Sequence, residues 1–353
     1  MKQQSVKSQK GEIEFRRKLF QQQVEGKCIF NDEFDAKGIE KMLSDRMKKT
    51  FEQMILLKES GVALSPYVEI GAERCQRSLV MENDLGATGA AVDISYDMLK
   101  SCDYYKGVFN KRKTPLRICC DANSLPFMTD SIPFVFCYET LHHFPAPTPI
   151  VKEIHRVLSP GGHFFFDEEP YKKVLHVNLY TGEKIYSKKS LSASKIRKIF
   201  DYFFSKRSCN EVEHGIIEND EMPIGIFRQA LTFFEEKNVK LQSPIKNIAS
   251  ELFNPKHYIK FLLAYLLGGG ISGICRKSGV SIKREISVHD VLICPSCIEN
   301  GRESKLSQKN LSFFCSECGH KFPISDGVVF LFSYKKFEEL YPEIFEKVTK
   351  GLK

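Results

Sequence analysis

Five short apolar runs, separated by helical or turn-rich stretches, constrain the fold of this chain more than any other feature. They are Tyr67–Ile70, Ala90–Asp93, Leu116–Cys120, Phe134–Tyr138 and His163–Asp167. Helical patterns follow the second and fourth runs, at residues 95–101 and 149–158. Strands that alternate with helices usually pair in parallel, and helices then cover both faces of the sheet. The sequence therefore predicts an α/β fold with a doubly wound parallel sheet.

The flanking segments carry weaker helical patterns. A stripe of apolar residues at three- and four-residue steps predicts a helix over residues 34–59, packed over the sheet's edge or closing as a lid. The stripe consists of Ile39, Leu43, Met47, Phe51, Met54 and Ile55. A second helix is expected over residues 222–237, followed by a strand at residues 239–241. Residues 268–273 hold four glycines but lack the Gly-Lys-Ser/Thr ending of a phosphate loop, so we expect a turn or tightly packed bend there.

The net charge of +8 is unevenly distributed. Residues 171–290 carry 20 Lys or Arg against 12 Asp or Glu, whereas residues 61–170 carry 10 against 14. A uniformly basic nucleic-acid binder would not show this pattern, and a local basic face is typical of contact with an anionic acceptor or surface. Part of the excess lies in a basic amphipathic helix expected over residues 187–207, with Leu191, Ile196, Phe200 and Phe203 on one side. That helix is either a solvated face or a contact for an anionic acceptor, nucleic-acid phosphates or a membrane surface.

Targeting signals are not evident in the sequence. It has no apolar run long enough to cross a bilayer, and its first twenty residues lack the apolar core of a secretory leader. Twelve cysteines in such a chain indicate thiols and metal ligation rather than a disulfide framework. We therefore expect a cytoplasmic protein in which peripheral membrane contact remains open.

Three of the predicted strands end in residues suited to a nucleotide-like ligand. Gly71 follows the first strand directly, and a glycine there lets the backbone turn tightly beside a ligand. Asp93 ends the second strand, where a carboxylate can accept both hydroxyls of a ribose. Asp121 follows the third strand and can accept from an exocyclic amine. The carboxyl ends of parallel strands meet at one edge, so these residues predict a single binding site.

The residues from 67 to 167 resemble class I S-adenosylmethionine-dependent methyltransferases, particularly the ubiquinone/menaquinone-biosynthesis type. The resemblance is carried by the strand ends above and by four further segments in order, Met98-Leu99, Leu125-Pro126-Phe127, Leu141-His142-His143-Phe144 and the stretch from Glu153 to Gly162. It implies a Rossmann-like methyltransferase sheet and S-adenosylmethionine as cofactor.

The resemblance also implies roles for individual residues. Glu69 and Gly71 would shape the loop under the methionine part of the cofactor, and Asp93 would bind its ribose. Asp121 would meet the adenine amine, and the backbone N–H of Ala122 would contact the ring.

This chain departs from the family pattern at two positions of the loop. The family has further glycines where this chain has Glu73 and Cys75. Each replacement adds bulk where backbone normally approaches the ligand. Glu73 also adds a negative charge, which would either oppose the cofactor carboxylate or pair with its ammonium group.

Methyl transfer from a sulfonium is an in-line displacement, so the protein mainly aligns donor and acceptor and excludes water. A hydroxyl acceptor would also need a base with a pKa near 7. The candidates at the ends of the fourth and fifth strands are Glu139, His142, His143, Asp167 and Glu168. His143 is the preferred base because of its intrinsic pKa, followed by Glu139 and Glu168. Alternatively, the histidine pair only caps a helix or lines the pocket.

Four cysteines near the C-terminus have the spacing of a structural zinc site. Cys294 and Cys297 are followed, after seventeen residues, by Cys315 and Cys318. Two such pairs deliver four thiolates to a tetrahedral zinc ion and leave no open catalytic position. His320 is a weaker ligand candidate. The module at residues 292–332 resembles the small zinc-ribbon protein that activates translation-related methyltransferases, which implies a built-in stabiliser covering apolar surface.

Together these features predict a methyltransferase that uses S-adenosylmethionine and zinc. We expect a helical cap (1–62), a cofactor-binding core (63–170), an acceptor-facing region that completes the core (171–290), a zinc ribbon (291–335) and a helical tail (336–353). The favoured acceptor is a small molecule or an anionic glycan- or lipid-linked molecule. The alternatives are an RNA or translation-factor methyltransferase, with nucleic acid less favoured, and a catalytically silent zinc-ribbon adaptor.

Overall fold

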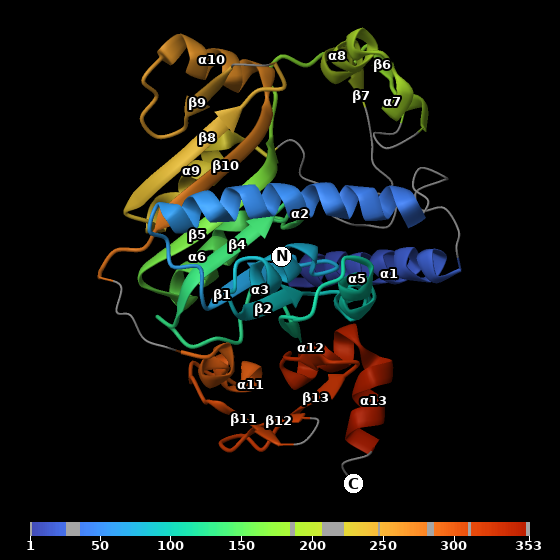
Figure 1. The fold of residues 1–353 in the computed structure, drawn as a ribbon, viewed down its shortest axis with the longest axis vertical. Coiled ribbons are helices and arrows are strands. Elements are labelled where there is room, and N and C mark those ends of the chain that lie inside the picture. The colour runs from blue at the N-terminus through green and yellow to red at the C-terminus, as the bar shows by residue number, and fades with distance from the viewer. Residues whose placement is uncertain are drawn as a thin grey trace.

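One mixed β-sheet runs through the whole molecule (Figure 1). The computed structural model describes residues 2–25, 36–183, 188–206, 222–245, 248–280, 286–309 and 312–350. Within them the strands follow the order β11-β12-β13-β14-β3-β2-β1-β4-β5-β10-β8-β9. The predicted α/β fold is therefore confirmed, although the sheet extends far beyond the five strands expected.

The central strands lie where the apolar runs predict them. They are β1 (Tyr67–Ile70), β2 (Gly89–Asp93), β3 (Leu116–Cys119), β4 (Ile132–Tyr138) and β5 (Leu158–Tyr171). All five pair in parallel in the order β3-β2-β1-β4-β5. Their side chains alternate between two cores: Val68 and Ile70 pack on one face, whereas Tyr67 packs on the other.

Helices cover both faces. On the face of Val68 lie α6 (Pro147–Val157) and α9 (Ile224–Ala230). The opposite face is covered by α1 (Lys2–Val24), α2 (Ala36–Glu59), α3 (Gln76–Asn83), α4 (Tyr96–Lys100) and α5 (Cys102–Val108). In α2 the stripe prediction is wrong at Phe51, which is 37% exposed, because Thr50 takes the buried position beside Met54.

The region after β5 adds an antiparallel extension. Strand β10 (Gly269–Arg276) pairs with β5 on one side and with β8 (Glu236–Gln242) on the other, and β9 (Ala249–Glu251) forms the edge. The bend expected at residues 268–273 is therefore wrong, because these residues begin a strand. A Cβ on Gly269 would lie 2.0 Å from the carbonyl oxygen of Gln242, so the glycine is needed for close pairing rather than for a turn.

Two other predictions in this region need correction. The helix expected over residues 222–237 ends much earlier, since α9 passes into the 3₁₀ helix η3 (Leu231–Phe233) and then into β8. The single basic helix expected over residues 187–207 is two helices, α7 (Lys188–Ser192) and α8 (Lys195–Phe204), because Ser194 caps α8 by accepting the N–H of Arg197 at 3.2 Å. Residues 187 and 207 and the side chain of Leu191 lie outside the described part.

Short elements complete the peripheral regions of the chain. Strands β6 (Tyr180–Thr181) and β7 (Ser205–Lys206) pair beside α8, and α10 (Tyr258–Leu267) precedes β10. The C-terminal elements are η4 (Val288–Val291), α11 (Pro295–Ile298), β11 (Leu306–Lys309), β12 (Ser312–Cys315), β13 (Lys321–Ser325), β14 (Val328–Phe330), α12 (Tyr334–Leu340) and α13 (Pro342–Lys350).

The C-terminal region adds its own strands to the central sheet. Strand β14 pairs in parallel with β3, with Val329 opposite Ile118. Behind β14, the fully buried ring of Phe330 stacks on Phe337 of α12 at 5.2 Å between centroids and meets Tyr341 edge-on at 5.5 Å. The β3 edge, which would otherwise expose unpaired backbone groups, is thereby covered.

Replacing Phe330 should test how much this junction contributes to stability. We expect Phe330→Ala to lower the free energy of unfolding by about 3–5 kcal/mol, because it leaves a cavity between β14, α12 and α4. Denaturant unfolding followed by circular dichroism would measure the change. Phe51→Ala on α2 is the control, because this ring is partly exposed and its loss should cost far less. Equal losses of stability in the two variants would show that the buried ring of Phe330 contributes no more than a partly exposed one.

Candidate active site and cysteine cluster

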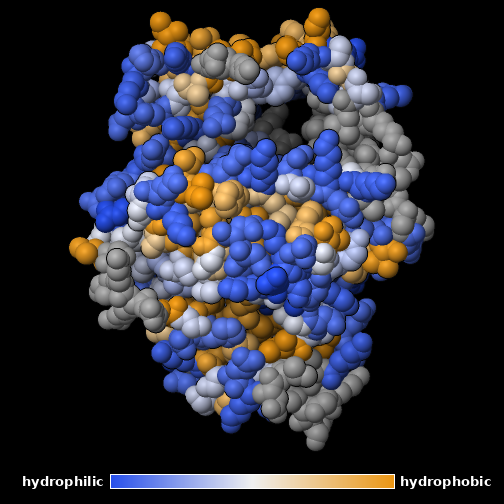
Figure 2. Space-filling model, in the orientation of Figure 1, coloured by the Kyte–Doolittle hydropathy of each residue, from blue (hydrophilic) through white to orange (hydrophobic). Residues whose placement is uncertain are grey.

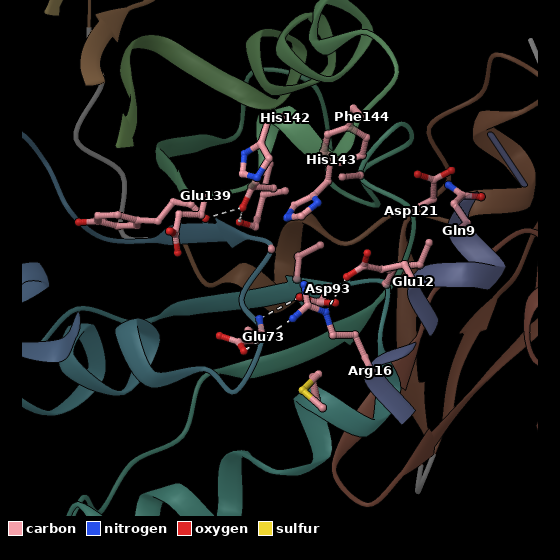
Figure 3. A pocket seen from close by; sticks show the side chains of 18 of the residues that line it. Gln9, Glu12, Arg16, Glu73, Asp93, Asp121, Glu139, His142, His143 and Phe144 are labelled. Atoms are coloured by element: carbon pink, nitrogen blue, oxygen red, sulfur yellow. Dashed lines mark hydrogen bonds and ion pairs between the residues drawn. The ribbon is translucent and has the colours of Figure 1, made fainter. Parts of the chain in front are cut away.

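A cavity of about 220 Å³ opens at the carboxyl edge of the parallel strands. It lies between the strand ends on one side and α1 and α2 on the other (Figure 3). Seven of the residues predicted as site candidates line it, namely Gly71, Asp93, Asp121, Ala122, Glu139, His142 and His143. Glu69 and Glu168 do not line it. Convergence of residues from four strand ends on one cavity is what the parallel topology requires.

The loop after β1 adopts backbone conformations that favour glycine. Gly71 has a φ of 69°, and a Cβ placed there would lie 2.3 Å from Oγ1 of Thr140. Glu73 and Cys75, which replace the glycines of the family, also have positive φ values of 48° and 59°. The loop therefore keeps a glycine-like path with larger residues, at a cost in backbone strain.

Arginines surround Glu73. Its Oε2 lies 3.1 Å from Nη1 of Arg46, Oε1 pairs with Arg74, and Arg16 Nη1 lies 4.0 Å from Oε1. Burial alone would raise the pKa of this carboxyl, but the guanidinium groups of Arg74, Arg46 and Arg16 lower it to about 2. The negative charge that the sequence adds to the loop is thus compensated by cations from α1 and α2.

Asp93 holds the loop with both carboxylate oxygens. Oδ2 accepts the backbone N–H of Glu73 and Oδ1 accepts that of Ser95, each at 2.8 Å. Burial raises the pKa of Asp93 to about 6, against the lowering effect of these two hydrogen bonds. Each oxygen has a further lone pair, so the carboxylate can still accept hydrogen bonds from a ligand in the cavity.

Asp121 is paired with the C-terminal region. Its Oδ2 forms an ion pair with Nζ of Lys336 on α12, and its Oδ1 accepts from the backbone N–H of Asn123 at 2.9 Å. Although burial would raise the pKa of Asp121, the charge of Lys336 lowers it below the ordinary value. Gln9 of α1 lies beside Asp121 (Figure 3), and its buried Oε1 has no hydrogen-bond partner among the described residues.

The two histidines after β4 are held by a carboxylate that sequence reasoning missed. Glu169 is fully buried, and it accepts the backbone N–H groups of Thr140, Leu141 and His142 at 2.8, 2.9 and 3.1 Å. It also lies 2.9 Å from Nδ1 of His142. Glu169 thereby fixes the 3₁₀ helix η1 (Leu141–His143) and the ring of His142.

His143 points into the cavity, on the side that faces Glu12 of α1 (Figure 3). Burial and the neighbouring His142 lower the pKa of His143 to about 4. The ring is therefore neutral near pH 7 and can accept a proton, although it is a weaker base than an ordinary histidine.

Two of the remaining carboxylates predicted from the sequence, Glu139 and Glu168, face α2, whereas Glu69 does not. Glu139 lines the cavity and pairs with Arg46 Nη2 at 2.7 Å. Glu168 pairs with Lys49 at 2.8 Å and with Arg77 at 3.0 Å, outside the cavity. Glu69 is buried behind the loop, where Ser78 Oγ donates to it at 2.5 Å, and burial raises its pKa to about 7.

Asp167 is likewise bound to α2. Its Oδ2 accepts from Nε2 of Gln53 at 2.7 Å and lies 2.7 Å from Nζ of Lys49. The carboxylate of Asp167 is therefore hydrogen-bonded and ion-paired outside the cavity. The structure thus brings His143 and Glu139 together with the strand-end residues, but leaves Glu69, Asp167 and Glu168 outside that group.

A helical cap was expected over residues 1–62, but the sequence did not indicate that α1 itself lines the cavity. Ser8, Gln9, Glu12 and Arg16 of α1 all line the cavity. The helix is polar for most of its length, and its buried apolar residues are sparse, so it lacks the regular stripe that identifies α2. The only available signal was the charged spacing of Glu12 and Arg16, which form a helical ion pair at 2.6 Å.

The four predicted metal-ligating cysteines form one cluster. The Sγ atoms of Cys294, Cys297, Cys315 and Cys318 all lie within 4.8 Å of one another. Two of the distances, Cys294–Cys318 and Cys297–Cys315, are 3.5 and 3.8 Å. Thiolates that bind zinc tetrahedrally at about 2.3 Å are separated by roughly 3.8 Å, so the cluster fits a four-thiolate zinc site.

His320 does not belong to the cysteine cluster. Its Nδ1 lies 2.9 Å from Oγ of Ser296, and its ring stacks on Tyr334 at 3.8 Å between centroids. Its role in the structure is therefore a packing contact between the cysteine module and α12. Six other cysteines of the described residues are buried and free.

Comparison with known proteins agrees with this geometry. Residues 68–166 match the family of methyltransferase domains. A chloroplastic methyltransferase of uncharacterised function from Arabidopsis thaliana is 37% identical over 90 residues, which span 24% of this chain and 25% of that relative's length. The chain thus contains a methyltransferase domain of the S-adenosylmethionine-dependent class.

Several solved structures are also similar. A chain from the complex of the Haloferax volcanii Trm112 methyltransferase activator with a methyltransferase has a TM-score of 0.40 and 17% identity, over 69% of this chain and 96% of that chain. An S-adenosylmethionine-dependent methyltransferase from Mesorhizobium loti has a TM-score of 0.39 and 17% identity, over 61% and 92%. Phosphoethanolamine N-methyltransferase 2 of Haemonchus contortus has a TM-score of 0.37 and 14% identity, over 65% and 52%.

Substitution of Gly71 should distort the loop and weaken cofactor binding. In Gly71→Ala the new Cβ would collide with Thr140, so we expect at least a roughly tenfold loss of S-adenosylmethionine affinity by calorimetry. Gly86→Ala is a matched control, since Gly86 has nearly the same φ of 67° but no atom within 4 Å of a new Cβ. If both variants bound the cofactor equally well, the close approach to Thr140 would be irrelevant to the site.

Removal of the cysteine ligands should show whether the cluster binds metal. We expect about one zinc ion per chain by elemental analysis, and its loss in Cys297→Ser together with a lower melting temperature. Cys275→Ala, in β10 and far from the cluster in sequence, should keep its zinc. A purified wild-type protein without metal, unchanged in stability on adding zinc, would contradict the zinc site.

Proposed function

We propose that this protein transfers the methyl group of S-adenosylmethionine to a small-molecule or anionic lipid- or glycan-linked acceptor. The observation that carries the proposal is the convergence of Gly71, Asp93 and Asp121 on one cavity inside a methyltransferase domain. The cofactor supplies an electrophilic methyl group on a sulfonium. The chain therefore needs to bind the cofactor, orient it toward the acceptor and exclude water.

Several features of the cavity fit that cofactor. Gly71 lets the loop pass close to Thr140 at the edge of the cavity, and the Asp93 carboxylate can accept from ribose hydroxyls. Gln9 Oε1 is an unused acceptor beside Asp121, which suits an adenine amine. Arg16 and Arg46 line the cavity and can donate hydrogen bonds to the cofactor carboxylate, with their charges already balanced by neighbouring glutamates. Gln9, Arg16 and Arg46 would thus add to the residues predicted from the sequence.

His143 is the residue best placed to assist an acceptor. Its lowered pKa keeps the ring neutral at pH 7, so it can orient an acceptor or take its proton. A pKa of about 4 makes it a weak base, which favours positioning over strong proton abstraction. Glu139 is held by Arg46 and would act as a second polar contact at the same end of the cavity. Glu168 would act by holding α2 in place.

The cysteine cluster supports a further part of the proposal. We infer that it binds zinc structurally and that the C-terminal module serves as a built-in counterpart of the zinc-ribbon activator. Its ion pair between Lys336 and Asp121 supports an influence on the cofactor site, and its β14 strand covers the β3 edge.

The test of cofactor binding is a calorimetric titration with S-adenosylmethionine at several pH values. Ionised Asp93 accepts strongly from the ribose hydroxyls, and protonation below its pKa of about 6 weakens it as an acceptor. The affinity should therefore be constant well above pH 6 and fall roughly tenfold for each pH unit below it. Asp93→Asn should bind the cofactor weakly and without this pH dependence. The carboxyl of Glu69, whose pKa is also raised, is still present in that variant. Tight, pH-independent binding by both proteins would contradict the role of Asp93.

The acceptor class can be separated in a second experiment. Incubation of the zinc-loaded protein with radiolabelled cofactor and a cell extract should label the organic-extractable or small-molecule fraction. Label that disappears after nuclease or protease treatment would favour the RNA or translation-factor alternative instead. Zinc binding without cofactor binding would favour a catalytically silent adaptor.

A further inference from the structure

We infer that the surface formed by residues 174–179, α8 and α10 docks on an anionic lipid bilayer. We call the exposed apolar side chains of these three segments the apolar rim. Figure 2 shows it as orange side chains along the top of the molecule, over α10 and α8, with blue side chains beside them. The inference goes beyond the proposed methyl transfer, because docking requires neither cofactor nor acceptor.

Exposed apolar side chains are concentrated in this rim. Twenty large apolar side chains are exposed in the described residues, and twelve of them lie in residues 174–200 and 258–265. Ile196 is 81% exposed, Ile259 74% and Tyr258 71%. Isolated apolar side chains are normal on a protein surface, but a concentration of them on three linked segments indicates an interaction site.

Helix α8 exposes its apolar side chains to solvent, whereas an ordinary surface helix buries them. Ile196, Ile199 and Phe200 lie at three- and four-residue steps and face solvent. The inward side holds polar groups instead: Asp201 is 5% exposed and lies 2.8 Å from Nε of Arg197, and Tyr202 donates to the carbonyl of Leu267 at 3.0 Å. A helix that turns its apolar stripe outward needs an apolar partner on that side.

The three segments are fastened to each other and to the sheet. The backbone N–H of Val174 donates to Leu266 O at the end of α10, and that of Val177 donates to Phe203 O at the end of α8. Tyr171, the last residue of β5, donates to Ala264 O of α10 at 2.8 Å. The rim is therefore rigidly connected to β5, the strand that carries Glu169.

Charge identifies the partner as an anionic lipid surface. The described residues between 171 and 206 carry eight Lys or Arg and two Asp or Glu, and Lys260 adds an exposed cation in α10. A second copy of this chain would bring two basic surfaces together, which disfavours self-association. Nucleic-acid phosphates would suit the lysines but not the outermost isoleucines. An anionic bilayer interface takes both, because basic groups meet the headgroups while apolar side chains enter the acyl boundary.

None of the helices in the described residues is both long and apolar enough to span a bilayer. Both α8 and α10 have ten residues, a length that suits lying along an interface.

Vesicle flotation tests the inference with the zinc-loaded full-length protein. We expect the protein to float with vesicles of phosphatidylcholine containing phosphatidylglycerol, and much less with phosphatidylcholine alone. The double variant Ile196→Ser/Ile199→Ser should lose roughly tenfold or more in partitioning. Lys195→Gln and Lys260→Gln should each lose roughly fivefold, and added salt should weaken binding further.

Leu56→Ser is the matched control, because Leu56 is 64% exposed on α2 and lies outside the rim. It should float like the wild type. The inference would be overturned by absence of flotation with anionic vesicles, or by equal loss in Leu56→Ser and the rim variants. A dimer in light scattering that the rim variants dissociate, or RNA binding that replaces vesicle binding, would also overturn it. Because the flotation assay contains no S-adenosylmethionine, its result is independent of the cofactor titration.

Discussion

Unpaired backbone N–H groups at the carboxyl edge of the parallel sheet are the constraint on which the site depends. Where strands end and helices begin, these donors need partners, and buried carboxylates provide them. Asp93 accepts from the loops after β1 and β2, and Glu169 accepts from three successive residues after β4. Both carboxylates thereby order the loops that form the cavity.

The parts of this arrangement that could be predicted from the sequence are those with local patterns. Gly71, Asp93 and Asp121 directly follow apolar runs, so the parallel topology places them at one edge. Glu169 was missed because Asp167, Glu168 and Glu169 are adjacent in sequence. Which of three neighbouring carboxylates points inward depends on the exact path of β5, and Glu168, with a φ of 63°, lies at a local distortion of that path. The sequence contains no signal for this reversal.

Long-range pairings were also beyond sequence reasoning. The strand β10 begins in a run of glycines, whose composition resembles a loop, and its identity depends on close approach to β8. Likewise, the spacing of the cysteines indicates a compact metal site but not where the module docks. That position follows from β14 pairing with β3 and from the aromatic contacts of Phe330. Edge pairing of this kind depends on backbone groups, which every sequence shares.

Both ends of the chain contact residues at the cavity, and this explains why the methyltransferase domain alone leaves the acceptor undefined. Helix α1 covers the cavity with Gln9, Glu12 and Arg16, whereas Lys336 of α12 occupies one oxygen of Asp121. Neither segment belongs to residues 68–166, which match the domain family. The common core therefore supplies the strand ends that suit a cofactor, and the terminal segments determine the space and charge left around it. Since α1 has to be in place over the cavity and α12 against β3, the site is complete only when both termini have docked on the sheet.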